Sequence, residues 1–420
     1  MNFNKLLLII IFIANRGICY IRAEINDSIK NWGVQFTANP ALIPTMDAEI
    51  REIIHNHNVF TAGMQFRKVS TPEQQDPFAH DFGYPTFAIG INYNFYNNIK
   101  FHRQDGPSLG MGKAVDYFST LGNSISAYAS FERPLLRNNR WEVDYAFNIG
   151  VGYSRLKYNP ENQVDNLMIG SNVLIYFGAG MHATYRIHHD WGIKAGIDFN
   201  HHSSGTLGRP NKGSNAIGPM LALVYYPYYQ KLLDKDKFNN SQEFKQTKYL
   251  NFSVDIGLKT LYEDWVQTQF NTPPGEKDYR TDDFKYYTVY TLKADYMKRY
   301  ARRWASGFGI DLYYLSYMDH VRKMDHHNGY SDKHSPISIG FSGKHEVFYH
   351  NLSLAMSLGV YLFKQHGHKA KNVEQPFYET IGLKYHIPEL NGLALGAFVR
   401  AHAFKADQTG ISISYPLQLK

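Results

Sequence analysis

The sequence has almost no cysteine and no long apolar run beyond its start. Cys19 is the only cysteine among 420 residues and lies within or beside the N-terminal apolar segment, so we expect no disulfide in the mature chain. No later stretch reaches the roughly 20 apolar residues that a transmembrane helix needs. There is also no Gly-x-Ser-x-Gly elbow, and Gly110–Lys113 has the wrong spacing for a phosphate loop. Helical membrane proteins, soluble α/β-hydrolases and P-loop nucleotide hydrolases are therefore disfavoured.

The N-terminal segment has the features of a secretory signal. Lys5 supplies the positive start, Leu6–Ala14 the apolar core, and Ile21-Arg22-Ala23 a small-residue cleavage site. We predict a cleaved signal peptide over residues 1–23. Lipid attachment at Cys19 is the alternative, but Ile18 before it is larger than that processing normally accepts.

The rest of the chain is polar on average yet rich in aromatic residues. Aromatics make up 15% of the residues, with 32 Tyr and 27 Phe, while the mean hydropathy is −0.41. An outer-membrane barrel has this composition, although a secreted β-sandwich shares much of it. The formal charge of +7 fits an anionic partner such as lipopolysaccharide phosphates, or simply a mildly basic surface. We predict no nucleic-acid partner, and the oligomeric state stays open.

Alternation of apolar and polar residues is the strongest regular signal. Apolar residues take the odd positions of Val173–Ile187, the even positions of Leu352–Leu362 and the odd positions of Leu393–Ala403. One apolar and one polar face over about 10 residues is typical of strands that cross a bilayer. We therefore predict an all-β chain that forms an antiparallel transmembrane β-barrel in the bacterial outer membrane. The tyrosine pairs Tyr225-Tyr226 and Tyr228-Tyr229 fit an interfacial girdle.

Connection lengths give the strand count and the domain organisation. Short turns such as His188–Asp190 alternate with long polar connections such as Ser204–Ser214, which predicts about 16 strands. Residues 24–229 supply eight strands and carry the candidate site, and residues 230–420 supply eight more. The second half could extend the same barrel or form a separate unit. We expect one larger barrel, because both halves have equally clean lipid-type faces; no internal repeat is evident.

The sequence His201-His202-Ser203-Ser204-Gly205 ends one of these strands. Residues two apart on a strand point to the same face, and His201 and Ser203 share the parity of Ile193, Ala195, Ile197 and Phe199. A base and a nucleophile therefore stand together on the apolar face. This placement predicts an esterase that takes its substrate from the bilayer. The pair His202 and Ser204 has the same spacing on the opposite face.

The following strand carries candidates for the other catalytic roles. Serine esterases need a base, a group that orients the base, and donors for the oxyanion. Asn215 lies on the same face of the next strand and can accept the ring N–H of His201. The oxyanion donors would be the backbone N–H of Ser204, with the Asn211 side chain or an N–H of Ser204-Gly205. Two cations that flank the site, Arg209 and Lys212, could hold a lipid phosphate or be solvated loop charges.

At these residues the chain resembles a known enzyme family. His-x-Ser followed by Pro210-Asn211-x-Gly213 is similar to the outer-membrane lipid A 3-O-deacylases (PagL type, also called acyloxyacyl hydrolases). The resemblance implies a His-Ser-acid triad on the outer face of a small barrel, and removal of an ester-linked acyl chain from lipid A. Two positions depart from the family pattern. Ser204 replaces an Asn after the nucleophile, and Asn215 replaces the acid.

The same segment also resembles outer-membrane phospholipase A. His201, Ser203, Gly205 and Asn215 fit its spacing, whereas Asn211 stands where a calcium-binding serine is usual. This resemblance implies phospholipid as substrate and calcium as cofactor. We otherwise predict no metal and no cofactor, because Asp325, His326, His327 and His334 lack ligand-like spacing. A porin-like barrel with an inert Ser203 hairpin is the alternative from another class.

Overall fold

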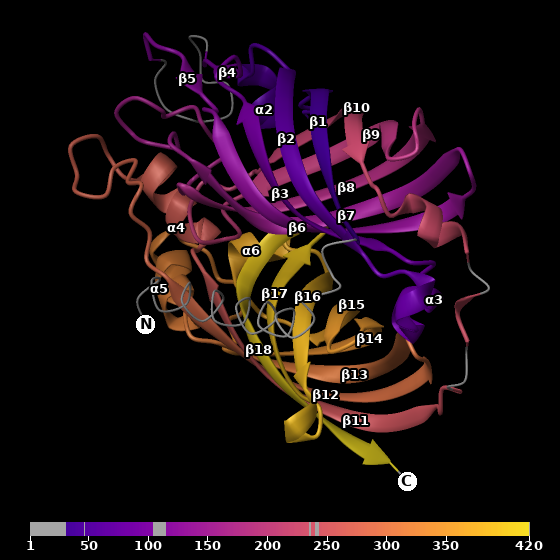
Figure 1. Cartoon of the computed structure of the whole chain (residues 1–420). Coiled ribbons are helices and arrows are strands. Elements are labelled where there is room, and N and C mark those ends of the chain that lie inside the picture. Colours follow the sequence, from indigo (N-terminus) through magenta and orange to yellow (C-terminus); the bar gives the residue numbers. More distant parts are fainter. Residues whose placement is uncertain (1–30, 46, 104–114, 235–236, 240–242, 420) are drawn as a thin grey trace. The chain divides into compact units, whose positions relative to one another are not determined.

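The computed structural model describes residues 31–45, 47–103, 115–234, 237–239 and 243–419 (Figure 1). The predicted signal peptide and Cys19 lie outside these residues. The described chain is built from antiparallel strands with a few short helices in the connections. Among the described residues, no helix is both long enough and apolar enough to cross a membrane. The predicted all-β class is confirmed.

Eight strands close into a first barrel in the order β1-β10-β9-β8-β7-β6-β3-β2 (Figure 1). They are β1 (Trp32–Leu42), β2 (Asn58–Val69), β3 (Thr86–Phe95), β6 (Ser124–Arg137), β7 (Trp141–Ser154), β8 (Val173–Arg186), β9 (Trp191–Ser203) and β10 (Ser214–Tyr225). The strands β4 (Lys100–Phe101) and β5 (Ser119–Thr120) form a separate two-stranded sheet in the connection between β3 and β6.

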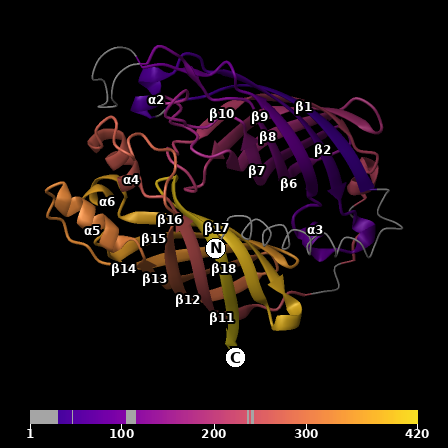
Figure 2. The same cartoon turned by 90° about the vertical axis from the view of Figure 1, so that its left-hand side faces the viewer.

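A second barrel closes in the order β11 to β18, also with eight strands (Figure 2). They are β11 (Thr247–Lys259), β12 (Tyr287–Ala301), β13 (Trp304–Leu315), β14 (Ile337–Tyr349), β15 (Leu352–Phe363), β16 (Phe377–Ile387), β17 (Leu393–His402) and β18 (Lys405–Leu419). The predicted total of sixteen barrel strands is confirmed.

The expectation of one larger barrel is wrong. β10 pairs with β1, from Val34↔Tyr225 to Leu42↔Ile217, and β18 pairs with β11, from Lys248↔Leu419 to Leu258↔Thr409. Each set of eight strands thus satisfies its own edges, and no edge is left to accept a strand from the other set. Alternation within strands could not show this, because it is the same in both arrangements.

Short helices occupy the connections. The first unit contains α2 (Ala48–Ile53), η3 (Pro72–Gln74), α3 (Pro77–Asp81), η5 (Tyr229–Leu233), α4 (Tyr262–Val266) and η7 (Gln267–Asn271); the second contains α5 (Met318–His327), α6 (His368–Val373) and η8 (Pro388–Leu390). Residues 71–85 hold η3 and α3, and residues 230–248 hold most of η5. α2 begins where the Asp47 carboxylate accepts the backbone N–H groups of Glu49 (3.0 Å) and Ile50 (3.3 Å).

The first compact unit is not a simple N-terminal half. It comprises Asn31–Ser241 together with Thr260–Tyr286, the segment that follows β11 and precedes β12. Trp265, Val266 and Phe284 of this segment belong to the same buried apolar cluster as Leu167 and Met168 of the first barrel's connections. The segment is therefore part of the packing around one end of the first barrel.

The first barrel is apolar outside and charged inside. Outward-facing side chains such as Ile89, Met181 and Ile197 are more than half exposed. In the lumen, Lys194 Nζ lies 2.6 Å from Glu132 and 3.1 Å from Asp144, and both carboxylates are buried. Buried charges require partners of opposite charge, as in this lumen. The apolar outer face is suited to contact with lipid.

Candidate active site

The candidate site lies where the β9–β10 hairpin leaves the first barrel. His201 pairs with Asn215 across the hairpin, and Phe177 of β8 lies on the other side of His201. Lys194, Asn200 and His202 are buried in the lumen, while Ile193 and Ile197 are exposed. The parity argument for β9 therefore holds, and His201 and Ser203 belong to the outward set of side chains.

His201 is oriented by Asn215. The Nδ1 atom of His201 lies 2.7 Å from Oδ1 of Asn215. Because an amide oxygen only accepts hydrogen bonds, the proton of the neutral ring resides on Nδ1. Nε2 is then left as the acceptor, which is the form that a general base needs. The sequence placed Asn215 beside His201 by parity alone, and the structure brings the two together.

Ser203 is the last residue of β9, two positions beyond His201 on the same face. Its side chain is buried, and no contact of the described residues joins its hydroxyl to His201, whose Nδ1 faces Asn215. The Ser203–His201 hydrogen bond that catalysis requires is therefore not formed here. Such bonds are commonly long before substrate binds.

The turn after Ser203 differs from the prediction in one respect. The backbone N–H of Ser204 donates to Asn211 Oδ1 (2.7 Å), so this predicted oxyanion donor is already engaged. The same contact fixes the Asn211 amide so that Nδ2 is its remaining donor. Ser204 Oγ accepts the N–H of Gly170 (3.0 Å), and Gly205 has a positive φ of +56°. The Asn211 side chain thus stabilises the turn through Oδ1 and remains a candidate oxyanion donor through Nδ2.

The two flanking cations, Arg209 and Lys212, already have hydrogen-bond or ion-pair partners within the chain. Lys212 Nζ forms ion pairs with Asp47 (2.7 Å) and with Glu49. The guanidinium of Arg209 donates to the carbonyl oxygen of Thr260, with Nη2 at 2.8 Å and Nε at 3.2 Å. Their predicted contact with a lipid phosphate stays a prediction, and either side chain would have to share its present partner.

The electrostatics of the surrounding connections follow from these contacts. Burial alone would raise the pKa of Asp47, but its hydrogen bond and ion pair with Lys212 hold the pKa below its ordinary value. Burial raises the pKa of the nearby Tyr262 hydroxyl, and the carboxylate charge of Glu49 adds to this. Asp47 is thus held in its charged form beside Lys212.

The alternative pair does not form a site in the described chain. His202 is fully buried in the lumen, where Nε2 lies 2.9 Å from Ser126 Oγ. Ser204 Oγ accepts the backbone N–H of Gly170, as described above. Among the loop residues considered as metal ligands, His334 Nε2 lies 2.7 Å from the Asp325 carboxylate, which also accepts the backbone N–H of His368 (2.8 Å).

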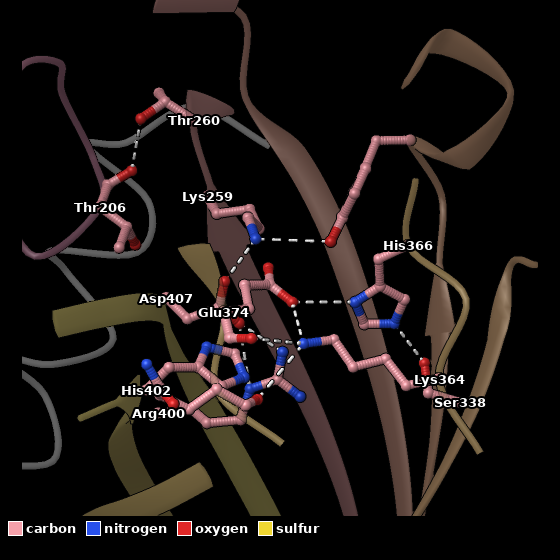
Figure 3. A network of polar contacts seen from close by, with 12 residues as sticks. Thr206, Lys259, Thr260, Ser338, Lys364, His366, Glu374, Arg400, His402 and Asp407 are labelled. Atoms are coloured by element: carbon pink, nitrogen blue, oxygen red, sulfur yellow. Dashed lines mark hydrogen bonds and ion pairs between the residues drawn. The ribbon is translucent and has the colours of Figure 1, made fainter. Parts of the chain in front are cut away.

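The lumen of the second barrel contains a polar network that sequence reasoning missed (Figure 3). Ser338 Oγ lies 2.5 Å from His366 Nε2, and His366 Nδ1 lies 3.1 Å from Glu374. The order Ser-His-Glu resembles a triad, but Ser338 is fully buried. No sequence signal connects these residues, because they come from β14 and from the connection between β15 and β16, on either side of α6.

The same network contains a carboxylate cluster with ligand-like spacing. Glu374, His402 and Asp407 offer oxygen or nitrogen atoms within 4.8 Å of one another. However, Lys364 Nζ lies 2.8 Å from Glu374, and Arg400 and Lys259 both pair with Asp407. Burial would raise the pKa of Glu374, but the hydrogen bond from His366 holds it below its ordinary value. The carboxylates are therefore neutralised by the chain's own cations, which argues against a cation site.

Comparison with known proteins agrees with the geometry. The family model described as lipid A 3-O-deacylase (PagL) matches residues 87–224, and the model described as the acyloxyacyl hydrolase C-terminal domain matches residues 243–419. The first covers β3 to β10 with the candidate site, and the second covers the whole second barrel. The fold is that of outer-membrane β-barrels, and both family models describe hydrolases. The chain belongs to the lipid A 3-O-deacylase (PagL) family.

Solved structures give weaker likenesses, and no curated protein matches the chain. The crystal structure of the outer membrane enzyme PagL is 14% identical, with a TM-score of 0.28, and the match covers 46% of this chain and 98% of that one. OccK8 (OprE) from Pseudomonas aeruginosa is 10% identical with a TM-score of 0.23, covering 94% and 99%. TM-scores this low carry no argument.

Proposed function

We propose that the chain is a serine esterase that removes an ester-linked acyl chain from lipid A. Ser203 Oγ attacks the ester carbonyl, and His201 Nε2 accepts the serine proton and then donates it to the leaving alkoxide oxygen, which departs as a hydroxyl. Water then cleaves the acyl-serine ester with His201 again acting as base. Asn215 keeps His201 in the required tautomer, a role for which Cys-His-Asn proteases provide a precedent.

One observation carries the proposal. The His201–Asn215 hydrogen bond of 2.7 Å fixes an imidazole with a free Nε2 on the outward face of the barrel, next to Ser203. A buried polar pair in the lumen would serve packing alone, whereas this pair stands among the apolar side chains that face the surroundings. Asn211 Nδ2, with backbone N–H groups of the turn, would stabilise the oxyanion.

The family match supports lipid A as the substrate. Phospholipid is the second candidate, because the same residues fit both resemblances and both substrates present acyl esters at the membrane surface. No step in this scheme uses a metal. Calcium dependence would point to the phospholipase.

Mass spectrometry of lipids incubated with the purified protein and with Ser203→Ala tests the proposal. We expect lipid A to lose one hydroxyacyl mass with the wild type and to remain intact with the variant. Lysophospholipid with intact lipid A would assign the site to a phospholipase instead. Unchanged lipids in both samples would contradict an esterase, and equal conversion by both proteins would exclude Ser203 as the nucleophile.

A further inference from the structure

The turn that follows Ser203 contains two consecutive residues in the left-handed region. Gly205 has φ +56° and Thr206 has φ +70°. Glycine adopts this conformation readily, but a β-branched residue with positive φ is a genuine outlier. Such residues persist where the surrounding structure holds them, and they gather at functional sites. Thr206 lies three residues beyond the proposed nucleophile, Ser203, so the contacts that hold its conformation also bear on the site.

Thr260 holds the strained residue from outside the hairpin (Figure 3). Its backbone N–H and its hydroxyl both donate to the carbonyl oxygen of Thr206, each at 2.9 Å. Both residues are fully buried or nearly so. Two donors on one carbonyl oxygen use both of its lone pairs, so the peptide plane after Thr206 is fixed in direction.

Thr260 begins the segment 260–286, and this segment makes further contacts with residues 206–209 of the turn. The carbonyl oxygen of Thr260 accepts from Arg209, and the Tyr286 hydroxyl donates to the carbonyl oxygen of Leu207 (3.0 Å). The first and last residues of the segment 260–286 thus both bind the stretch 206–209. Most of these contacts are to backbone atoms, which constrain the course of the chain.

The segment is itself anchored on the first barrel's connections. Trp265 packs edge-on against Tyr158 with ring centroids 5.1 Å apart, and the Tyr158 hydroxyl donates to Gln269 (2.9 Å). Lys157 forms an ion pair with Asp282 (2.7 Å). The segment that carries Thr260 is therefore also held by contacts outside the turn.

We infer that Thr260 is a positioning residue of the esterase site, acting through the backbone of Gly205-Thr206 on the oxyanion side of Ser203. This inference rests on the proposed function. It also assigns a role to sequence beyond the first barrel, because Thr260 directly follows β11. On this inference, the first barrel of this chain needs the segment 260–286 for full activity.

A double-mutant cycle with turnover kinetics tests the inference. Thr260→Val removes the hydroxyl donor and keeps the shape of the side chain. We expect kcat on lipid A to fall about tenfold with KM within about twofold, since the substrate-binding surface is unchanged. Thr260→Ser restores the hydroxyl and the rate. Thr206→Gly removes the strain, so Thr260→Val should cost no more than about twofold in that background.

Thr268→Val is the matched control. It removes a threonine hydroxyl from the same segment, where Thr268 Oγ1 donates to the carbonyl oxygen of Trp265 (3.2 Å), with no contact to the turn. We expect wild-type kcat. Heat-modifiability on electrophoresis confirms that each variant forms folded barrels.

The outcomes separate the two proposals. If hydrolysis depends on Ser203 but Thr260→Val keeps full kcat, the positioning role is wrong and the esterase stands. If Thr260→Val and Thr268→Val lose the same activity, or Thr206→Gly gives no rescue, the segment stabilises the fold generally and the inference fails. If wild type and Ser203→Ala do not differ, the proposed function fails and the inference with it.

Discussion

At the scale of single residues, Gly213 makes the arrangement of His201 possible. Gly213 has φ +71°, and a Cβ built on it would lie 2.7 Å from His201 Cε1. An added methyl must therefore displace the imidazole from Asn215, since the backbone behind it is fixed by the Gly213 N–H bond to Met168 (3.0 Å). We predict that Gly213→Ala lowers kcat on lipid A by about 10²-fold, which is the order expected for a 1 Å displacement of a catalytic group.

Gly329→Ala is the control for this prediction. Gly329 also has a positive φ, +79°, but open space surrounds the position of its Cβ. Both variants carry the same backbone penalty for alanine, so only the contact with the ring distinguishes them. Equal activity of the two variants, measured by the same turnover assay, would show that Gly213 is needed for its backbone alone.

How far the sequence predicted the site also depends on scale. His201, Ser203 and Asn215 were placed on one face by parity, because strand alternation depends only on residue spacing. The engagement of the Ser204 N–H by Asn211 was not predicted, since it depends on the φ angles of the turn. The partners of Arg209 and Lys212 could not be predicted either, because Thr260 and Asp47 are far away in the sequence.

At the scale of elements, the Asp47–Lys212 ion pair joins the N-terminus of α2 to the site turn. The pKa of Asp47 lies below its ordinary value of 3.8. The contribution of its carboxylate to the stability of the folded state is therefore complete above about pH 3.8 and is lost as the pH falls further. We predict that hydrogen-exchange protection of the Lys212 and Gly213 amides declines in that acid range, after correction for the intrinsic rate. These amides donate to Leu167 (3.2 Å) and Met168 (3.0 Å).

Asp47→Asn shows whether the carboxylate is responsible. We expect the variant to have weaker protection at neutral pH, without the additional decline below pH 3.8. Glu49 also pairs with Lys212, so some protection should remain in the variant. An acid decline of the same size in both proteins would assign the pH dependence to another group.

At the scale of the whole molecule, the closure into two separate barrels argues against a wide channel. A sixteen-stranded barrel would enclose an aqueous pore, whereas an eight-stranded one has an interior that side chains can fill. The sequence predicted the number of strands correctly through its connection lengths. It could not show which strand closes on β1, because any pairing of neighbouring hairpins preserves the same alternation.

Both lumens are filled in the described chain. Charged side chains cross the first lumen, where Lys194 and its two carboxylates are buried. The second lumen contains a cavity of about 60 Å³ among groups such as Asp255, Lys293 and Lys344, enough for a few water molecules. An ion would have to break several buried ion pairs to pass, and each would leave an uncompensated charge.

We therefore predict no steady ion conductance from the purified protein in planar bilayers, with a sixteen-stranded porin in the same bilayers as the positive control. Protection of the protein from protease in reconstituted vesicles verifies insertion, so that a lack of conductance cannot be due to a lack of inserted protein. Lys194→Ala, which removes the charge that bridges Glu132 and Asp144, should at most add brief openings. Steady ohmic conductance of the wild type, unchanged by Ser203→Ala, would contradict the filled lumens and favour a porin-like function over the esterase.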